Sequence, residues 1–251
     1  MEHYASAQTV FAGGLIFARL GAMVMLIPGI GEAFIPARIR LALAFMMTLA
    51  LFPVLSAGAP AEPGDVAGLA GAILKESLIG LLLGGILRMF MNSLATAGEI
   101  VSLQTTLAFA QTANPTQATP STTVGTFLGL IGTVLVMTTN LHHLFIGAVA
   151  HSYVIFPFHR DIPVGDAATL AIQTMGRSMA LGVQLAAPVM VFAFVFNIAT
   201  GLVGRVMPQF QVFFVATPLM LMTSLSIFAL SLGAIGMVWV ERYRDMLAVF
   251  G

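Results

Sequence analysis

Ionisable side chains inside long apolar segments are the residues of this chain that could do chemistry. Arg19 lies in the middle of LIFARLGAMVMLIPG, and Lys75 and Glu76 lie near the start of ILKESLIGLLLGG. A lipid-exposed charge costs about 2.5–3.5 kcal/mol on insertion scales, so Arg19 must face protein or water. Adjacent helical residues point about 100° apart, so Lys75 and Glu76 should find different neighbours. Two roles stay open for Arg19: a structural ion pair or carbonyl cap, and the lining of a conduit.

Histidine pairs can bind metals or relay protons, and this chain carries His142, His143 and His151 in NLHHLFIGAVAHSY. Adjacent histidines point to different helix faces, and the segment has no Asp or Glu, so we expect a structural or interfacial role. Glu99 with Gln104 is interpreted as a polar helix contact. The sequence shows no phosphate loop, no dinucleotide motif and no spaced nucleophile, base and acid. We therefore expect no enzyme, no cofactor and no metal site.

The composition places these residues in a membrane protein. Hydrophobic residues make up 59% of the 251 positions and charged residues only 8%, which a soluble domain could not bury. There is no cysteine, so disulfides and thiolate metal sites are excluded, and a net charge of zero gives no electrostatic basis for binding nucleic acid. The N-terminus lacks the features of a cleavable signal, so the first apolar segment is expected to be retained.

A span needs about 20 apolar residues, which predicts about six hydrophobic helices in one membrane domain covering residues 1–251. They are expected near Val10–Ile30, Leu41–Ala57, Leu69–Met91, Phe127–Ala150, Ala180–Leu202 and Phe210–Val240. A seventh, weaker helical pattern over Leu94–Ala110 carries Glu99 and Gln104 and is expected to be buried against protein. The positive charges do not resolve the orientation in the membrane.

The segment from Asn197 to Pro218 is the most unusual apolar region, because Arg205, Pro208 and Gln209 interrupt it. Each proline removes a backbone donor, so this segment needs protein, water or the membrane interface around it. Elsewhere, Gly80 and Gly84 have the small-xxx-small spacing that lets two helices approach closely. The 16 methionines and 19 phenylalanines fit two roles, ordinary core filling and a closable hydrophobic constriction.

An ordered set of short motifs resembles the FliR family of flagellar biosynthesis proteins and its injectisome (SctT- and SpaR-like) counterparts, over nearly the whole chain. The last block is the most specific. The matching residues are Arg19, Gly21, Pro28, Pro36, Arg38 and Arg40, then KES with Gly80 and Gly84, AGEIVSLQTTLAFA, NLHHLFIGAVAHSY, Ala187 and Pro188, and finally Asn197, Gly201, Arg205, Pro208, Gln209, Val212, Phe213 and Pro218.

The resemblance implies an all-α subunit of the type III protein export gate in the bacterial inner membrane, at the flagellar basal body. It implies helical hairpins held within a pore-forming complex with FliP and FliQ homologues, FlhB alongside and FlhA beneath. Unfolded secretion substrates would pass through, driven by the proton-motive force and a separate ATPase. The resemblance further implies close helix packing at Gly80, Gly84 and Gly201. The residues expected to serve assembly and polar helix contacts are Arg19, Arg38, Arg40, Lys75, Glu76, Glu99, Gln104, Asn197, Arg205, Pro208 and Gln209.

The resemblance also implies a plug loop that closes the pore with phenylalanines. Phe109 matches its first phenylalanine, whereas Thr112 stands where a second is common and Thr106 where a glycine is usual. Three alternatives remain open. One is a secondary transporter with Arg19, Glu99 and His142 along its path, one is an accessory scaffold without pore surface, and one is the equivalent injectisome subunit.

Overall fold

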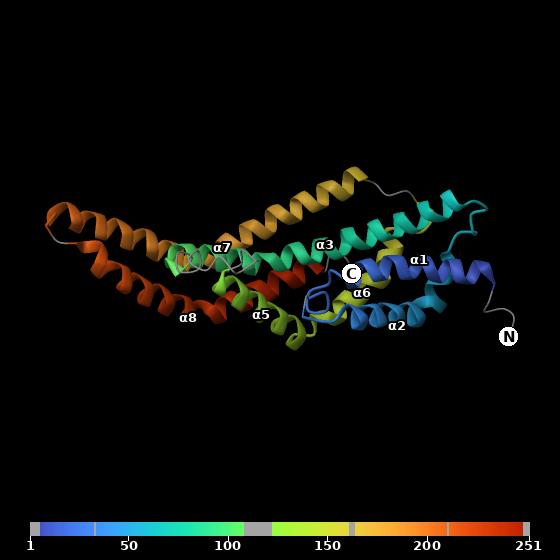
Figure 1. The fold of residues 1–251 in the computed structure, drawn as a ribbon, viewed down its shortest axis with the longest axis horizontal. Helices are drawn as coiled ribbons and strands as arrows, with labels where there is room; N and C mark the ends of the chain where they lie inside the picture. The colour runs from blue at the N-terminus through green and yellow to red at the C-terminus, as the bar shows by residue number, and fades with distance from the viewer. Residues whose placement is uncertain (1–5, 33, 108–121, 161–163, 210, 248–251) are drawn as a thin grey trace. The chain divides into compact units, whose positions relative to one another are not determined.

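The computed structural model is built from helices over the residues that it describes (Figure 1). It describes all residues except 1–5, 33, 108–121, 161–163, 210 and 248–251. The helices are α1 (Ala7–Val24), α2 (Ala37–Leu55), the 3-10 turn η2 (Ser56–Gly58), α3 (Val66–Gln104), α5 (Thr123–Thr138), α6 (Leu141–Ile155), α7 (Val164–Val206) and α8 (Val212–Leu247). Over these residues there is no strand, which confirms the all-α prediction.

Among the described residues, five helices are long and apolar enough to cross a membrane, or six spans if α5 and α6 together form one broken span. This agrees with the prediction of about six hydrophobic helices. Several helices begin where a side chain satisfies a free backbone N–H group. The Ser6 hydroxyl accepts from Thr9 before α1, the Asp65 carboxylate from Gly68 before α3, and the Thr122 hydroxyl from Gly125 before α5.

Two of the predicted helix boundaries are wrong. The segment 94–110 is not a separate helix, because α3 runs without a break from Val66 to Gln104. No proline stands between these two residues to end the helix earlier. The segment 127–150 is not one helix, because Asn140 has the left-handed φ of 58° and separates α5 from α6. Asparagine tolerates this conformation better than most residues.

The described residues fall into two compact units. Unit 1 is the described part of Met1–Phe90, Val136–Met175 and Arg244–Gly251, and unit 2 that of Met91–Leu135 and Gly176–Tyr243. The prediction of one membrane domain over residues 1–251 stays a prediction.

Close helix contacts build unit 1. Helices α1 and α2 pack together, with the rings of Phe17 and Phe45 6.3 Å apart. α1 also lies against the glycines of α3, where a Cβ at Gly84 would be 3.0 Å from the Met23 carbonyl oxygen and one at Gly80 2.9 Å from the Ala22 Cβ. A larger residue at either glycine would therefore have to displace α1.

Glycines also set the packing of unit 2, around the second part of α3. A Cβ at Gly98 would lie 2.5 Å from the backbone nitrogen of Gly125 in α5, and one at Gly182 in α7 would lie 3.0 Å from the Ser93 carbonyl oxygen. From α8, the fully buried Trp239 donates its Nε1–H to the Ser93 hydroxyl at 3.1 Å and stacks on Tyr243. α3 is therefore contacted by α5, α7 and α8 in this unit.

Ser93→Ala is expected to destabilise unit 2 by about 1–3 kcal/mol, because it leaves the buried indole N–H of Trp239 without its acceptor. Trp239 is the chain's only tryptophan, so its fluorescence during denaturant unfolding in detergent reports on this contact. Ser226→Ala on the exposed face of α8 is the control and should leave the midpoint unchanged. Equal midpoints for both variants would contradict the prediction.

Candidate functional site

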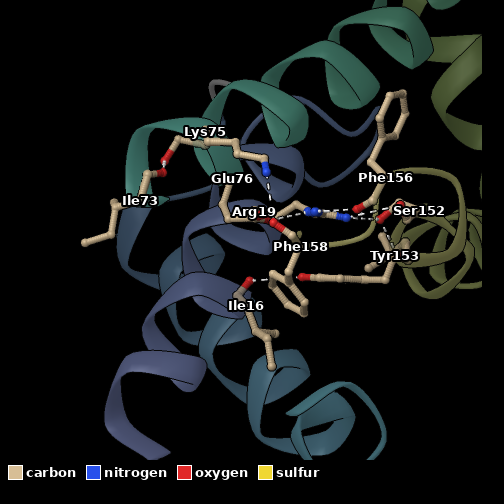
Figure 2. A network of polar contacts seen from close by, with 11 residues as sticks. Ile16, Arg19, Ile73, Lys75, Glu76, Ser152, Tyr153, Phe156 and Phe158 are labelled. Atoms are coloured by element: carbon tan, nitrogen blue, oxygen red, sulfur yellow. Dashed lines mark hydrogen bonds and ion pairs between the residues drawn. The ribbon is translucent and has the colours of Figure 1, made fainter. Parts of the chain in front are cut away.

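The most developed polar site among the described residues surrounds Arg19 in unit 1 (Figure 2). The Arg19 side chain has 0% exposure. Its Nε lies 2.6 Å from Oε2 of Glu76 on α3. Its Nη1 donates to the Ser152 carbonyl at 3.1 Å and its Nη2 to the Phe156 carbonyl at 2.8 Å. The planar guanidinium thus joins α1 to α3 and to the C-terminal end of α6.

Aromatic rings complete the surroundings of the guanidinium. The Arg19 Cζ lies 4.0 Å from the centroid of the Tyr153 ring and 5.6 Å from that of Phe158. Such cation–π contacts are worth about 2 kcal/mol or more when water is excluded. Lys75 on α3 donates to the Phe158 carbonyl at 2.8 Å. Lys75 and Glu76 therefore have different neighbours, as their spacing predicts.

We call this set the polar clamp: Arg19, Lys75 and Glu76 with Ser152, Tyr153, Phe156 and Phe158. Its two cations hold carbonyls at and just after the C-terminal end of α6, where a helix carries partial negative charge. Of the two roles left open for Arg19, this geometry is that of the ion pair and carbonyl cap. The guanidinium has no exposed surface in this chain with which to line a conduit.

Sequence reasoning did not identify the acceptors in the polar clamp. Ser152 and Phe156 act through backbone carbonyls, which carry no signal in residue type. Glu76 lies 57 positions after Arg19 and Ser152 133 positions after it, so local spacing could not pair them. A second ion pair was also missed: Arg88 of α3 lies 3.1 Å from Glu32, which follows α1.

Most of the other predicted assembly residues have free surface in this chain. Asn197, Gly201, Arg205, Pro208 and Gln209 are all exposed around the end of α7 and the following turn. A Cβ at Gly201 would meet nothing within 4 Å, so the described residues supply no close neighbour there. Close packing at Gly201 stays a prediction.

The arginines at the start of α2 also lack partners in the described part of the chain. Arg38 is exposed. The Nε atom of Arg40 is buried and has no hydrogen-bond partner there. An assembly role for either arginine stays a prediction.

The predicted plug follows α3 in the sequence. Glu99 is exposed rather than buried against the chain, and Gln104 is half-buried. Thr106 has a left-handed φ of 63°. Phe109 and Thr112 lie outside the described residues, so the structure does not test the plug. Within the described ranges, no group of three His, Asp or Glu side chains could hold a metal ion.

The family and its relatives are recognised along nearly the whole chain. The family described as "Bacterial export proteins, family 1" matches residues 10–246. The chain is 57% identical over 250 residues, the full length of both proteins, to "Flagellar biosynthetic protein FliR" of Caulobacter vibrioides. It is 30% identical to the protein of that name in Escherichia coli, over 84% of this chain and 80% of the other. It is 26% identical to that of Bacillus subtilis, over 94% and 95%. The chain therefore belongs to family 1 of the bacterial export proteins.

Proposed function

We propose that this chain is a structural, pore-forming subunit of the type III protein export gate that serves flagellar assembly. In this role it passes unfolded substrate proteins across the bacterial inner membrane at the flagellar basal body. The observation that carries the proposal is the full-length similarity, at 57% identity, to a protein named for flagellar biosynthesis. The same name supports a flagellar system over an injectisome.

The proposed partners are homologues of FliP and FliQ within the gate, with homologues of FlhB and FlhA beside it. The exposed end of α7 supports this, because Arg205 and Gln209 would be costly next to lipid. The buried, unpartnered Nε of Arg40 supports it further, because a partner oxygen would satisfy it. Arg205 and Arg40 are therefore proposed to meet carboxylates or helix carbonyls of neighbouring subunits.

The mechanism is passive and needs no catalytic residue or cofactor. The subunit supplies part of the wall of the passage, and energy comes from the proton-motive force and a separate ATPase. The polar clamp fits a structural role, because its charged groups are engaged within the chain. The energy that drives substrate transport would then come from outside this subunit.

The test is affinity purification of the tagged chain from solubilised membranes, with mass spectrometry and native mass of the particle. Recovery of FliP and FliQ homologues in one stable particle is the expected result. A lone protein that transports a small solute in liposomes would overturn the proposal in favour of a secondary transporter.

The family resemblance makes Phe109 the first candidate for the hydrophobic seal. Phe109→Ala is expected to increase ion leakage through the assembled, resting complex, because a smaller side chain excludes water less well. Conductance of the complex in planar bilayers measures this. Phe194→Ala, on an exposed position of α7, is the control for loss of a phenylalanine elsewhere. Unchanged conductance in the Phe109 variant would count against the plug assignment.

A further inference from the structure

A stripe of polar side chains runs along the second part of α3, in unit 2. Asn92, Thr96 and Glu99 follow at spacings of four and three residues, which places them on one face of the helix. Asn92 and Glu99 are exposed, and Thr96 is half-buried. We call these three residues the α3 polar stripe.

Two neighbouring helices approach α3 on either side of this stripe. On one side, a Cβ at Gly182 of α7 would lie 3.0 Å from the Thr96 Cβ. On the other side, a Cβ at Gly125 of α5 would lie 3.3 Å from the Ala95 carbonyl oxygen and 3.7 Å from the Glu99 Cγ. The glycines bring both backbones close to α3, yet the ends of the stripe stay exposed between them.

The charge of Glu99 decides what can lie against the stripe. Neither of the two ion pairs found among the described residues includes Glu99. Lipid is a poor neighbour, because a carboxylate near the bilayer centre costs about 2.5–3.5 kcal/mol. Polar residues in membrane segments face a protein interior or a water-filled cavity instead. The chain's own packing covers the opposite face of α3, through Leu94, Ala97 and Val101, each with 1% exposure.

Water satisfies this stripe more simply than a partner helix does. The stripe combines an amide, a hydroxyl and a carboxylate that only accepts hydrogen bonds. A partner helix would have to present a matched donor to Glu99 and a matched group to Asn92, two turns away. Water supplies both, and an exporter needs a hydrated wall for passengers of many sequences.

We propose that the α3 polar stripe lines the aqueous passage of the export gate and contacts the unfolded polypeptide in transit. This inference rests on the proposed function. Asn92 and Thr96 offer neutral polar groups that show no preference for one polypeptide sequence over another. Glu99 adds a carboxylate that attracts the lysine and arginine side chains of a passing chain.

The absence of cysteine from the chain permits a direct test by thiol labelling. Asn92→Cys and Glu99→Cys are made singly, and the intact export complex is purified. The complex is treated with a positively charged methanethiosulfonate reagent, which reaches a thiol only through water. Labelling is followed by the mass of the intact subunit. Both thiols should react about tenfold faster or more than a buried thiol, because reaction requires an accessible thiolate.

Two control variants distinguish a position that water reaches from one that is buried and from one that is exposed in this chain but expected to lie against lipid or protein. Ala97→Cys lies on the buried face of the same helix at 1% exposure, and Val191→Cys lies on an apolar position of α7 at 64% exposure. Both are expected to react slowly. If the complex forms and the Glu99→Cys thiol reacts no faster than these controls, a partner helix or lipid covers the stripe and the inference is overturned. If no complex is recovered even with the wild-type chain, the proposed function itself fails.

Discussion

Arg19→Leu is expected to destabilise unit 1 by about 3–5 kcal/mol, because it leaves the Glu76 carboxylate buried without its cation. The Ser152 and Phe156 carbonyls lose a donor at the same time. The contact with the Tyr153 ring is lost as well. These losses fall on one site that joins three helices, so α1, α3 and the end of α6 should loosen together.

Two further variants separate the charge from the geometry of the guanidinium. Arg19→Lys should fall between wild type and Arg19→Leu, because an ammonium can pair with Glu76 but lacks the planar fork that also reaches both carbonyls. The double variant with Glu76→Leu should recover part of the loss, because it removes the unpaired buried charge.

The measurement is the thermal unfolding midpoint of the detergent-solubilised chain and of the assembled complex. Arg177→Leu, an exposed arginine of α7 with no proposed assembly role, is the control for loss of a surface charge. An Arg19→Leu protein as stable as this control would contradict a structural role for the polar clamp.

The sequence predicted the helices well, because length and apolar content decide whether a segment can span a membrane. It also predicted that Arg19 needs a polar neighbour. It could not predict which neighbour, because Glu76 and Ser152 come from distant segments and two of the acceptors are carbonyls. The break at Asn140 was missed because no proline or glycine marks the position.

The backbone just after α3 gives a physical meaning to one departure from the family pattern. The resemblance places a glycine at the position of Thr106, and the structure gives Thr106 a φ of 63°. Glycine adopts this conformation without penalty, whereas a residue with a Cβ pays roughly 1–2 kcal/mol. The left-handed backbone conformation therefore explains why glycine is usual at this position. In this chain Thr106, a β-branched residue, adopts the same conformation at that energetic cost. The sequence alone showed the departure but not its physical meaning.

Gly98→Ala is expected to destabilise unit 2 by about 3 kcal/mol, the upper end of the usual cost of overpacking. The added Cβ would lie 2.5 Å from the Gly125 nitrogen and 2.7 Å from the Val124 carbonyl carbon. Both contacts are with backbone, so no side-chain rotation relieves them and α5 itself must move away from α3. This movement would also shift α5 relative to the α3 polar stripe, which α5 flanks at Gly125.

A glycine-to-alanine substitution at an open position of α5 provides the matched control for Gly98→Ala. A Cβ at Gly129 would meet nothing within 4 Å, so Gly129→Ala should be neutral or stabilise α5 by up to about 1 kcal/mol through better helix propensity. Fluorescence of Trp239, which bonds to Ser93 on the same part of α3, follows the unfolding of both variants in detergent. The unfolding free energies of the two alanine variants should therefore differ by several kcal/mol. The Gly98→Ala midpoint should fall, and the Gly129→Ala midpoint should stay or rise. Equal midpoints would mean that α3 and α5 do not approach at Gly98 as closely as the structure has them.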